Sequence, residues 1–241
     1  MTEKVIVLAA GKGNRLRRRT NGCSKCLVPV AGRPLIHHVL TSLAEAGLRE
    51  AVLVLGHYGE QLEANLGDGQ QFGIKLHYVW NPDYALGNAS SFWRALPAVG
   101  SEPFLLVMGD HLCSASLFRT FLADIDGQSA LAVDRSDLGE ERTAEATKVA
   151  LVDGVIVDIG KGLTRWDGVD TGVSHWAAGA FGPASDRVPE GELAALMACL
   201  VHNEGGLAAR DVSGHFWLDV DTEDDLRLAE ESLQADEHCL A

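Results

Sequence analysis

The stretch that decides the fold is Lys4–Ile36, KVIVLAAGKGNRLRRRTNGCSKCLVPVAGRPLI. It opens with the apolar run Val5–Leu8, which is typical of a strand buried on both faces, as in a parallel sheet. The residues that follow have little or no side chain, so a ligand can approach the backbone N–H groups of Ala9, Ala10, Gly11 and Gly13. We therefore predict a ligand-binding loop at the carboxyl end of a central strand.

The charge of this stretch indicates an anionic ligand. Between Lys4 and Ala44 there is no acidic residue, although the whole chain has a net charge of −14. The basic residues of the stretch are Lys4, Lys12, Arg15, Arg17, Arg18, Arg19, Lys25 and Arg33. A local reversal of sign in an acidic protein favours an anion at this loop. The run Arg17–Arg19 by itself is typical of a solvated basic face, and we interpret it in that way.

Neither of the two common phosphate-loop motifs fits this stretch. A Walker A loop requires G-x-x-x-x-G-K-[ST], and the dinucleotide fingerprint requires G-x-G-x-x-G followed by an acidic residue about 20 positions on. Residues 8–16, LAAGKGNRL, and 24–36, SKCLVPVAGRPLI, instead resemble the signature of the sugar nucleotidyltransferases, with Ser24 where that family usually has a proline. The resemblance implies nucleotide binding by Leu8, Ala9, Ala10, Gly11, Gly13, Arg15 and Lys25, with Arg15 and Lys25 as the catalytic residues.

Composition excludes several functional classes. Acidic residues outnumber basic ones by 34 to 20, whereas nucleic-acid binding depends on excess positive charge. No run approaches the about 18 apolar residues of a membrane span, and no signal-peptide cleavage pattern is present, so we expect a cytoplasmic protein. The five cysteines are odd in number, and Cys23-x-x-Cys26 has no second pair, so neither disulfides nor zinc are expected.

The chain length of 241 residues predicts a single domain spanning 1–241. Apolar patterns indicate helices over 34–47 and 58–66 and strands over 51–55 and 74–79, which continue the first strand in the order β-α-β-α-β. The predicted fold class is α/β, with a Rossmann-like, mostly parallel sheet flanked by helices. We expect nucleotide binding in residues 1–135 and acceptor binding in residues 136–222, and we leave a homodimer open.

The second half contains a clear hairpin signal. Residues 148–161 form two apolar runs joined by Asp153-Gly154, a dipeptide typical of a two-residue hairpin turn. We predict a small antiparallel lid over the acceptor, followed by a helix over 191–202. Lys148 and Lys161 lie at the outer ends of the hairpin, where they either meet near the acceptor or remain solvated edge lysines.

The loop at residues 81–91, NPDYALGNASS, has two interpretations. Asn88, Ser90 and Ser91 precede a helix that we expect to run to Leu96, and such residues routinely cap helices. A helix N-terminus at the ligand end of a sheet can also bind a ligand. The resemblance implies that Gly87 and Asn88 contact the base and ribose.

Three aspartates form a candidate metal site. Asp110 follows the apolar strand 104–108, and a carboxylate in that position suits a hard cation such as Mg²⁺. Asp219 and Asp221 alternate along a later strand, so they should point to one face and share that cation. An additional interpretation of this segment is that Thr222 caps the final helix.

Further motifs narrow the resemblance. Asp110-His111, EATKV at 145–149, VDIGK at 157–161, VDTG at 169–172 and WLDVDTEDD at 217–225 are similar to the cytidylyltransferases that activate inositol 1-phosphate as CDP-inositol. Those enzymes are often fused to a membrane-bound CDP-alcohol phosphotransferase, and we expect only the soluble part here. The resemblance implies CTP, a phosphorylated alcohol and Mg²⁺ as ligands, with acceptor binding by His111, Lys148, Lys161, Asp170, Thr171 and Gly172.

Alternative functions remain open from sequence. Phosphocholine, phosphonate and other sugar-phosphate nucleotidyltransferases share the same framework. A nucleotide-sensing domain without turnover is the non-enzymatic alternative, because this fold also occurs without catalysis. Retention of Arg15, Lys25, Asp110 and Asp219 together favours an enzyme.

Overall fold

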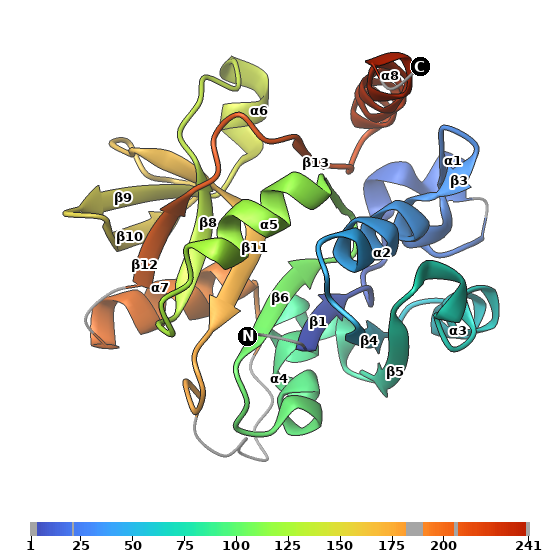
Figure 1. Cartoon of the computed structure of the whole chain (residues 1–241), viewed down its shortest axis with the longest axis horizontal. Coiled ribbons are helices and arrows are strands. Elements are labelled where there is room, and N and C mark those ends of the chain that lie inside the picture. The colour runs from blue at the N-terminus through green and yellow to red at the C-terminus, as the bar shows by residue number, and fades with distance from the viewer. Residues whose placement is uncertain (1–3, 21, 182–189, 205–206, 240–241) are drawn as a thin grey trace.

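The computed structural model describes residues 4–20, 22–181, 190–204 and 207–239. A nine-stranded sheet with the strand order β5-β4-β1-β6-β11-β8-β12-β10-β9 crosses the molecule (Figure 1). The strands of its first part are β5 (Lys75–Trp80), β4 (Glu50–Leu55), β1 (Lys4–Leu8) and β6 (Phe104–Met108). The strands of its second part are β11 (Gly168–Trp176), β8 (Ala130–Asp134), β12 (Leu207–Asp211), β10 (Val155–Gly160) and β9 (Lys148–Val152).

The first part of the sheet is parallel throughout. Strand β1 is central, and its residue Val5 pairs with Ala51 of β4 on one side and with Leu105 of β6 on the other. Its apolar side chains are buried on both faces, which accounts for the unbroken run of Val and Ile at this position. The predicted α/β class with a Rossmann-like sheet is confirmed, and the expected parallel order is found in this first part of the sheet.

Helices cover both faces of the sheet. One face packs on α2 (Leu35–Glu45), α3 (Gly59–Leu66) and α5 (Ala115–Ala123), whose buried residues share one core cluster with Val5 and Val7. The other face packs on α4 (Asn88–Val99) and α7 (Leu193–Glu204), which share a second cluster with Ile6 and Leu8. Because successive residues of β1 point to opposite faces, one short strand anchors both helical layers.

The second part of the sheet is mixed in direction and curls. Strand β11 is antiparallel to both β6 and β8, whereas β12 is parallel to β8. The predicted hairpin is present as β9 and β10, and Asp153 and Gly154 have the positive φ values, 50° and 79°, of its two-residue turn. The hairpin continues the main sheet instead of standing apart, because β10 pairs with β12 and β9 also pairs with β11.

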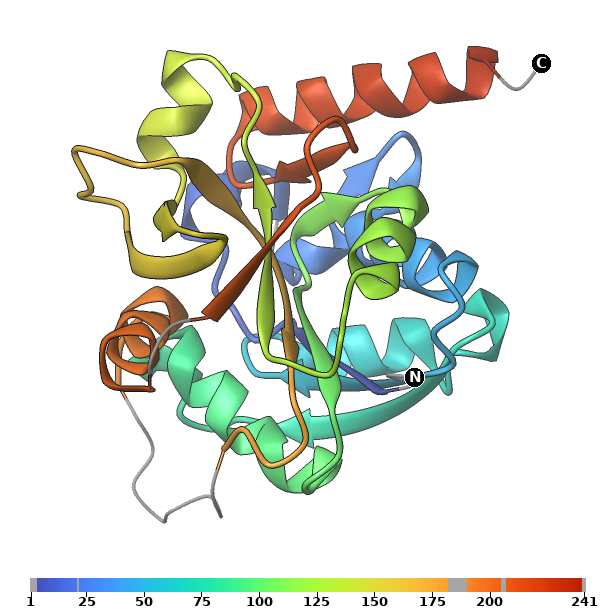
Figure 2. The ribbon, with the colours of Figure 1, turned by 60° about the vertical axis from the view of Figure 1, so that its left-hand side comes forward.

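A small ribbon beside the main sheet carries part of the site. Strand β7 (His111–Cys113) follows β6 almost directly and pairs antiparallel with β13 (Trp217–Asp219). Helix α8 (Glu223–Cys239) follows β13 and runs along one side of the molecule (Figure 2). The remaining short elements are α1 (Arg17–Thr20), β2 (Pro29–Val30), β3 (Arg33–Pro34) and α6 (Glu140–Glu145). None of the described helices has the length and apolarity needed to cross a bilayer.

Several elements differ from the sequence-based expectation. Helix α4 was expected to end at Leu96 but continues to Val99. Pro97 has no backbone N–H to donate, but it lies close to the end of the helix, so the loss of one backbone hydrogen bond does not end the helix there. Strands β7, β11 and β12 were not predicted. Strand β11 mixes glycine, aspartate and threonine with apolar residues and so shows no regular alternation.

Candidate active site

A cavity of about 990 Å³ lies at the carboxyl end of β6. Its walls come from both parts of the sheet, from α6 and α7, and from the β13–α8 junction. The predicted site residues that line it are Arg15, Asn88, Asp110, His111, Lys161, Asp170, Gly172, Asp219 and Asp221. The topology therefore gathers residues from the whole length of the chain at the edge where ligands of α/β sheets bind.

Lys25 and Arg15 are two of the cations at this site, and Lys25 is the more buried of the two. Its side chain is only 5% exposed, and its ammonium donates to Asp110 Oδ2 at 2.7 Å and to Asp221 Oδ1. Burial lowers the pKa of Lys25, but the charges of Asp110 and Asp221 outweigh this effect and raise it. The same pairing holds the pKa of Asp110 below its ordinary value against the opposing effect of burial. Both partners are therefore ionised at neutral pH.

The glycine-rich loop packs directly on this lysine. Gly13 has a φ of +59°, and a Cβ built there would lie 2.5 Å from Lys25 Cβ. A side chain at position 13 would therefore clash with the lysine stem as well as strain the backbone. Among the described residues, none has a heavy atom within 4 Å of the position that a Cβ of Gly11 would take, so the loop is open there, as expected for a ligand approaching its backbone. Leu8, Ala9 and Ala10 are buried beneath it.

Asp221 has a different environment from the one predicted. Its carboxylate bonds to both Lys25 and Arg15, and its sharing of a metal with Asp219 stays a prediction. Strand β13 ends at Asp219, so the strand alternation that suggested a common face stops before Asp221. Thr222 caps α8 as predicted, because its Oγ1 accepts from Asp225 N and its own backbone N–H donates to the Asp225 carboxylate.

Asp110, His111 and Asp219 form a second group, and their ligand-type atoms all lie within 4.8 Å of one another. The register of the ribbon places Asp219 directly opposite His111, with His111 Nε2 3.5 Å from Asp219 Oδ1. Asp110 Oδ1 and Asp219 Oδ1 are buried and accept no hydrogen bond from any described residue. Two buried carboxylate oxygens that accept no hydrogen bond, and that have, among the described residues, only the more distant His111 Nε2 as an ion-pair partner, match the oxygen ligands of a hard divalent cation.

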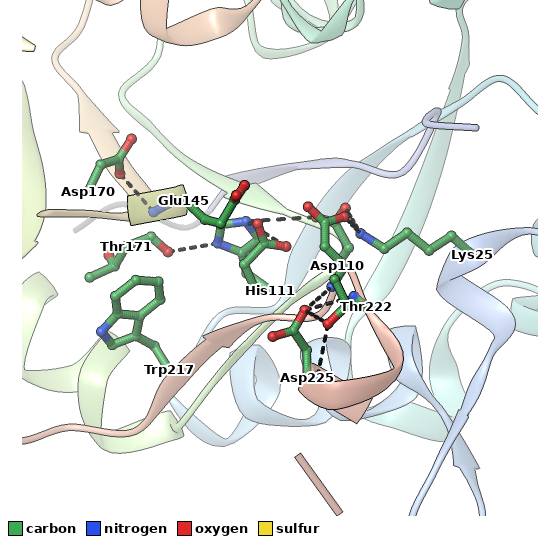
Figure 3. Close-up of polar contacts among 12 residues, drawn as sticks. Lys25, Asp110, His111, Glu145, Asp170, Thr171, Trp217, Thr222 and Asp225 are labelled. Carbon is green, nitrogen blue, oxygen red and sulfur yellow. Dashed lines mark hydrogen bonds and ion pairs between the residues drawn. The ribbon is translucent and has the colours of Figure 1, made fainter. Parts of the chain in front are cut away.

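The pKa values of this group depend on burial and on the charges of its members. Burial raises the pKa of Asp219 to about 6, and the nearby His111 opposes that shift. Burial lowers the pKa of His111, but Asp219 and Asp110 outweigh it and raise the value. His111 Nδ1 lies 3.0 Å from the Thr171 carbonyl oxygen, to which it donates, so Nε2 is the atom directed at the carboxylates (Figure 3).

The predicted acceptor residues separate into lining and supporting groups. Asp170 lines the cavity with one carboxylate oxygen bound to Gly172 N at 2.7 Å, and burial raises its pKa. Thr171 turns its hydroxyl away, toward the Ala132 carbonyl, so only its backbone reaches the site through His111. Gly172 has a φ of +78°, and a Cβ there would lie 2.4 Å from His111 Nδ1.

Lys148 and Lys161 do not meet through their ammonium groups. The Lys148 side chain is buried, and its Nζ donates to the backbone oxygen of Lys161 at 3.0 Å. Lys161 lines the cavity and is exposed. Of the two, Lys161 is the one placed for direct ligand contact, and Lys148 holds the end of the hairpin that carries it.

Of the predicted pair Gly87 and Asn88, only Asn88 lines the cavity. Asn88 does not cap α4, as one interpretation had it, but is the first residue of that helix and accepts the backbone N–H of Leu193 at the start of α7. Gly87 has a φ of +110°, and a Cβ there would lie 2.2 Å from the Gly191 oxygen. Ser90 and Ser91 accept instead from the buried Asn81 amide.

Helix α6 lines the cavity with residues that were missed from sequence, among them Arg142 and Glu145. Arg142 lies over the Trp217 ring at 5.3 Å, and Glu145 lies 3.7 Å from Arg15. Glu145 belongs to the run EATKV, but nothing in that run indicates which side chains face inward. The only signal for α6 is a short charged segment, which is equally typical of a solvated loop.

Comparison with known proteins shows which family this chain belongs to. The model of a MobA-like NTP transferase domain matches residues 5–157. The bifunctional IPC transferase and DIPP synthase of Rubrobacter xylanophilus is 37% identical over 232 residues, which cover 93% of this chain and 50% of that protein. Its counterpart in Aquifex aeolicus is 31% identical over 234 residues, covering 97% and 52%. The chain thus spans about half the length of these relatives.

Solved structures of nucleotidyltransferases match nearly the whole chain. The inositol-1-phosphate CTP transferase from T. maritima superposes with a TM-score of 0.82 at 28% identity, covering 95% of this chain and 94% of that one. A putative glucose-1-phosphate thymidylyltransferase from Bacillus anthracis gives a TM-score of 0.80 at 20% identity, which supports the fold alone. The resemblance to sugar nucleotidyltransferases is confirmed, and the chain belongs to the family of MobA-like NTP transferase domains.

Proposed function

We propose that this chain transfers CMP from CTP to inositol 1-phosphate, giving CDP-inositol and pyrophosphate. The observation that carries the proposal is the likeness to the inositol-1-phosphate CTP transferase, which extends over nearly all of both chains. The relatives named as IPC transferase and DIPP synthase support it over the same residues. The site adds the necessary chemistry, because Arg15 in the cavity wall and Lys25 behind Asp110 lie beside carboxylate oxygens that accept no hydrogen bond from the described residues.

The nucleotide side of the site is suited to a triphosphate. An acceptor phosphate oxygen would attack the α-phosphorus, with pyrophosphate leaving on the opposite side. Lys25 and Arg15 would stabilise the charge that develops on the phosphoryl oxygens. Asp221 holds both cations in place before the nucleotide binds, so little reorganisation is needed at the reaction step. The open backbone at Gly11 leaves room for the phosphates.

Mg²⁺ is the cation that this donor set fits best. Asp110 Oδ1 and Asp219 Oδ1 are the ligands we assign to it, since both are buried and accept no hydrogen bond from a described residue. When bound, the ion would neutralise triphosphate oxygens and orient the leaving group. Asp110 would then contact the ion with one oxygen and Lys25 with the other, which fixes the lysine relative to the phosphates.

The acceptor side presents groups that match a phosphorylated polyol. Lys161 is placed for the acceptor phosphate, and Asp170 keeps one carboxylate oxygen free of the Gly172 hydrogen bond to accept from hydroxyl groups. An aminoalkylphosphonate is the second candidate. The CMP-5'-(3-aminopropyl)phosphonate synthase of Streptomyces rubellomurinus is 37% identical over 132 residues, and a carboxylate such as Asp170 also suits an ammonium group.

The test is pyrophosphate release measured with four nucleoside triphosphates and a panel of acceptors. We expect the highest kcat/KM with CTP and inositol 1-phosphate. The panel includes phosphocholine, 3-aminopropylphosphonate and glucose 1-phosphate, and a higher kcat/KM with any of these would reassign the acceptor. An absence of turnover with every pair, in a protein that binds CTP, would favour the nucleotide-sensing alternative.

A further inference from the structure

Trp217 makes a buried hydrogen bond that the proposed reaction does not use directly. Its indole Nε1 donates to Asp134 Oδ2 at 2.7 Å, and both residues are among the buried ones. The other oxygen of Asp134 accepts from the backbone N–H and the hydroxyl of Ser136. Both carboxylate oxygens are therefore occupied, and Asp134 has no free oxygen with which to bind a ligand.

This hydrogen bond joins the main sheet to the small ribbon. Asp134 is the last residue of β8 in the second part of the main sheet, whereas Trp217 is the first residue of β13 in the small ribbon, where β13 pairs with β7 directly after Asp110. Strand β13 has only three residues and one strand neighbour, so its own ladder fixes it weakly. The indole is an additional anchor at its first residue, and Asp219 is its third residue.

Arg142 completes the surroundings of the indole. Its guanidinium lies over the Trp217 ring, and its NH2 group donates to the Trp217 backbone oxygen at 3.1 Å. Trp217 is thus held at its ring nitrogen, its ring face and its carbonyl. Figure 3 shows the indole on the side of the site occupied by Thr171 and Asp170, across His111 from Lys25.

We propose that Asp134 is a positioning residue which, through Trp217, fixes the strand carrying Asp219 and so sets the affinity of the Asp110–Asp219 pair for a divalent cation. The proposal rests on the metal site proposed above. Its physical basis is that a ligand oxygen must be held within a fraction of an ångström, and that residues behind metal ligands supply this restraint. Removing such a partner typically weakens metal binding by about 10- to 100-fold.

The test uses two variants. Trp217→Phe removes the hydrogen-bond donor and keeps an aromatic ring, and Asp134→Asn keeps the size and shape of the aspartate side chain. Asparagine has one acceptor oxygen, so it cannot accept from Ser136 and Trp217 on opposite sides as the carboxylate does. The probe is Mn²⁺ titrated into the nucleotide-free protein, with unbound Mn²⁺ followed by electron paramagnetic resonance. We expect each variant to weaken Mn²⁺ binding by about tenfold or more. The Mg²⁺ concentration for half-maximal pyrophosphate release should rise by a similar factor, while kcat at saturating Mg²⁺ largely recovers.

A matched control separates positioning from general stability. Trp176 is also buried and donates from Nε1 to a side-chain oxygen, that of Ser174, but it pairs with Phe104 at the far end of β6. Trp176→Phe should lower the melting temperature without changing Mn²⁺ affinity. Unchanged Mn²⁺ affinity in both Asp134→Asn and Trp217→Phe, or an equal loss in Trp176→Phe, would overturn the inference. Asp219→Asn tests the metal site itself: if wild-type protein and this variant bind Mn²⁺ alike, the proposed site fails and the inference fails with it.

Discussion

The nucleotide part and the acceptor part each bury a lysine, and they compensate its charge differently. Lys25 is paired with two carboxylates that come from distant positions in the chain, Asp110 and Asp221. Lys148 donates to a backbone carbonyl, that of Lys161, within its own hairpin. The first arrangement holds a charge ready for an anionic ligand, whereas the second uses a charged group to fix a chain segment.

This difference extends to the neighbouring groups. On the nucleotide side the functional side chains bond to one another, as Arg15 and Lys25 do to Asp221. On the acceptor side they bond to the backbone, as Asp170 does to Gly172 N and His111 to the Thr171 oxygen. We infer that the charges of the nucleotide side act directly on phosphate groups, while acceptor recognition depends on how the backbone of β10 and β11 presents single side chains.

The largest effect should come from Lys25→Met. It removes the charge that would stabilise the transition state and leaves Asp110 without its ion-pair partner, so we expect kcat to fall by about 10²- to 10³-fold. Arg19→Met is the matched control, because Arg19 is 59% exposed and lies 3.8 Å from Glu223. An exposed ion pair of this kind contributes little to stability, and Arg19 forms no ion pair with Asp110 or Asp221 in the described structure, so the control should change kcat by less than about twofold. Similar losses in both variants would mean that the whole basic stretch, and not the paired lysine, acts on the phosphates.

The two hairpin lysines should have separable effects of intermediate size. Lys161→Met should raise KM for the acceptor by about tenfold or more with no change in melting temperature, because an exposed cation is lost from the cavity wall. Lys148→Met should lower the unfolding free energy by about 1 to 3 kcal/mol, because it removes the donor to the Lys161 oxygen. Acceptor titrations and urea unfolding on both variants measure these effects. A Lys148→Met protein of normal stability with a raised KM would make that lysine a ligand-contacting residue.

Asp110 and Asp219 should respond to pH in opposite ways. Burial raises the pKa of Asp219 to about 6, above the value of about 3.9 for an unfolded aspartate. The folded protein therefore binds more protons between these two values, and its stability without metal should decline as pH rises through about 4 to 6. Lys25 keeps the pKa of Asp110 low, so that carboxylate contributes stability above the unfolded pKa and loses it on acidification.

Urea unfolding in chelator and in excess Mg²⁺ measures this contrast. Added Mg²⁺ should stabilise the wild-type protein more at neutral pH than near pH 4.5, since about one proton must leave Asp219 before the ion binds. Asp219→Asn should remove this Mg²⁺-dependent difference and stabilise the metal-free protein at neutral pH, whereas Asp110→Asn should destabilise it. A metal-free Asp219→Asn protein less stable than wild type would contradict the assignment of Asp219 as an uncompensated carboxylate.

The features that the sequence predicted depend on local pattern, whereas those that it missed depend on contacts between distant segments. Strand β1, the glycine-rich loop and the Asp153-Gly154 turn were predicted correctly because each depends on local pattern or on a motif. The strand that carries Asp219 was predicted, but its partner β7 and their pairing were not, since a strand of three residues such as β7 carries no periodicity of its own. The contact of Asp221 with Lys25 and that of Lys148 with the Lys161 backbone depend on how distant segments pack, which one sequence does not determine.

The smallest effect concerns an ion pair between α6 and the glycine-rich loop region, Arg15 with Glu145 at 3.7 Å. Both side chains are more than half exposed, at 54% and 74%, so the pair contributes at most about 1 kcal/mol and is weakened by salt. Glu145→Gln should free Arg15 for the nucleotide and lower KM for CTP by about two- to threefold at low salt, with no change near 1 M salt. Among the described side chains, Glu141 on the same helix forms no ion pair with Arg15, so Glu141→Gln removes an equal charge as the control. If Glu145→Gln instead raised KM for CTP by tenfold, α6 would be part of the nucleotide site, and the division into a nucleotide side and an acceptor side would have to be redrawn at this helix.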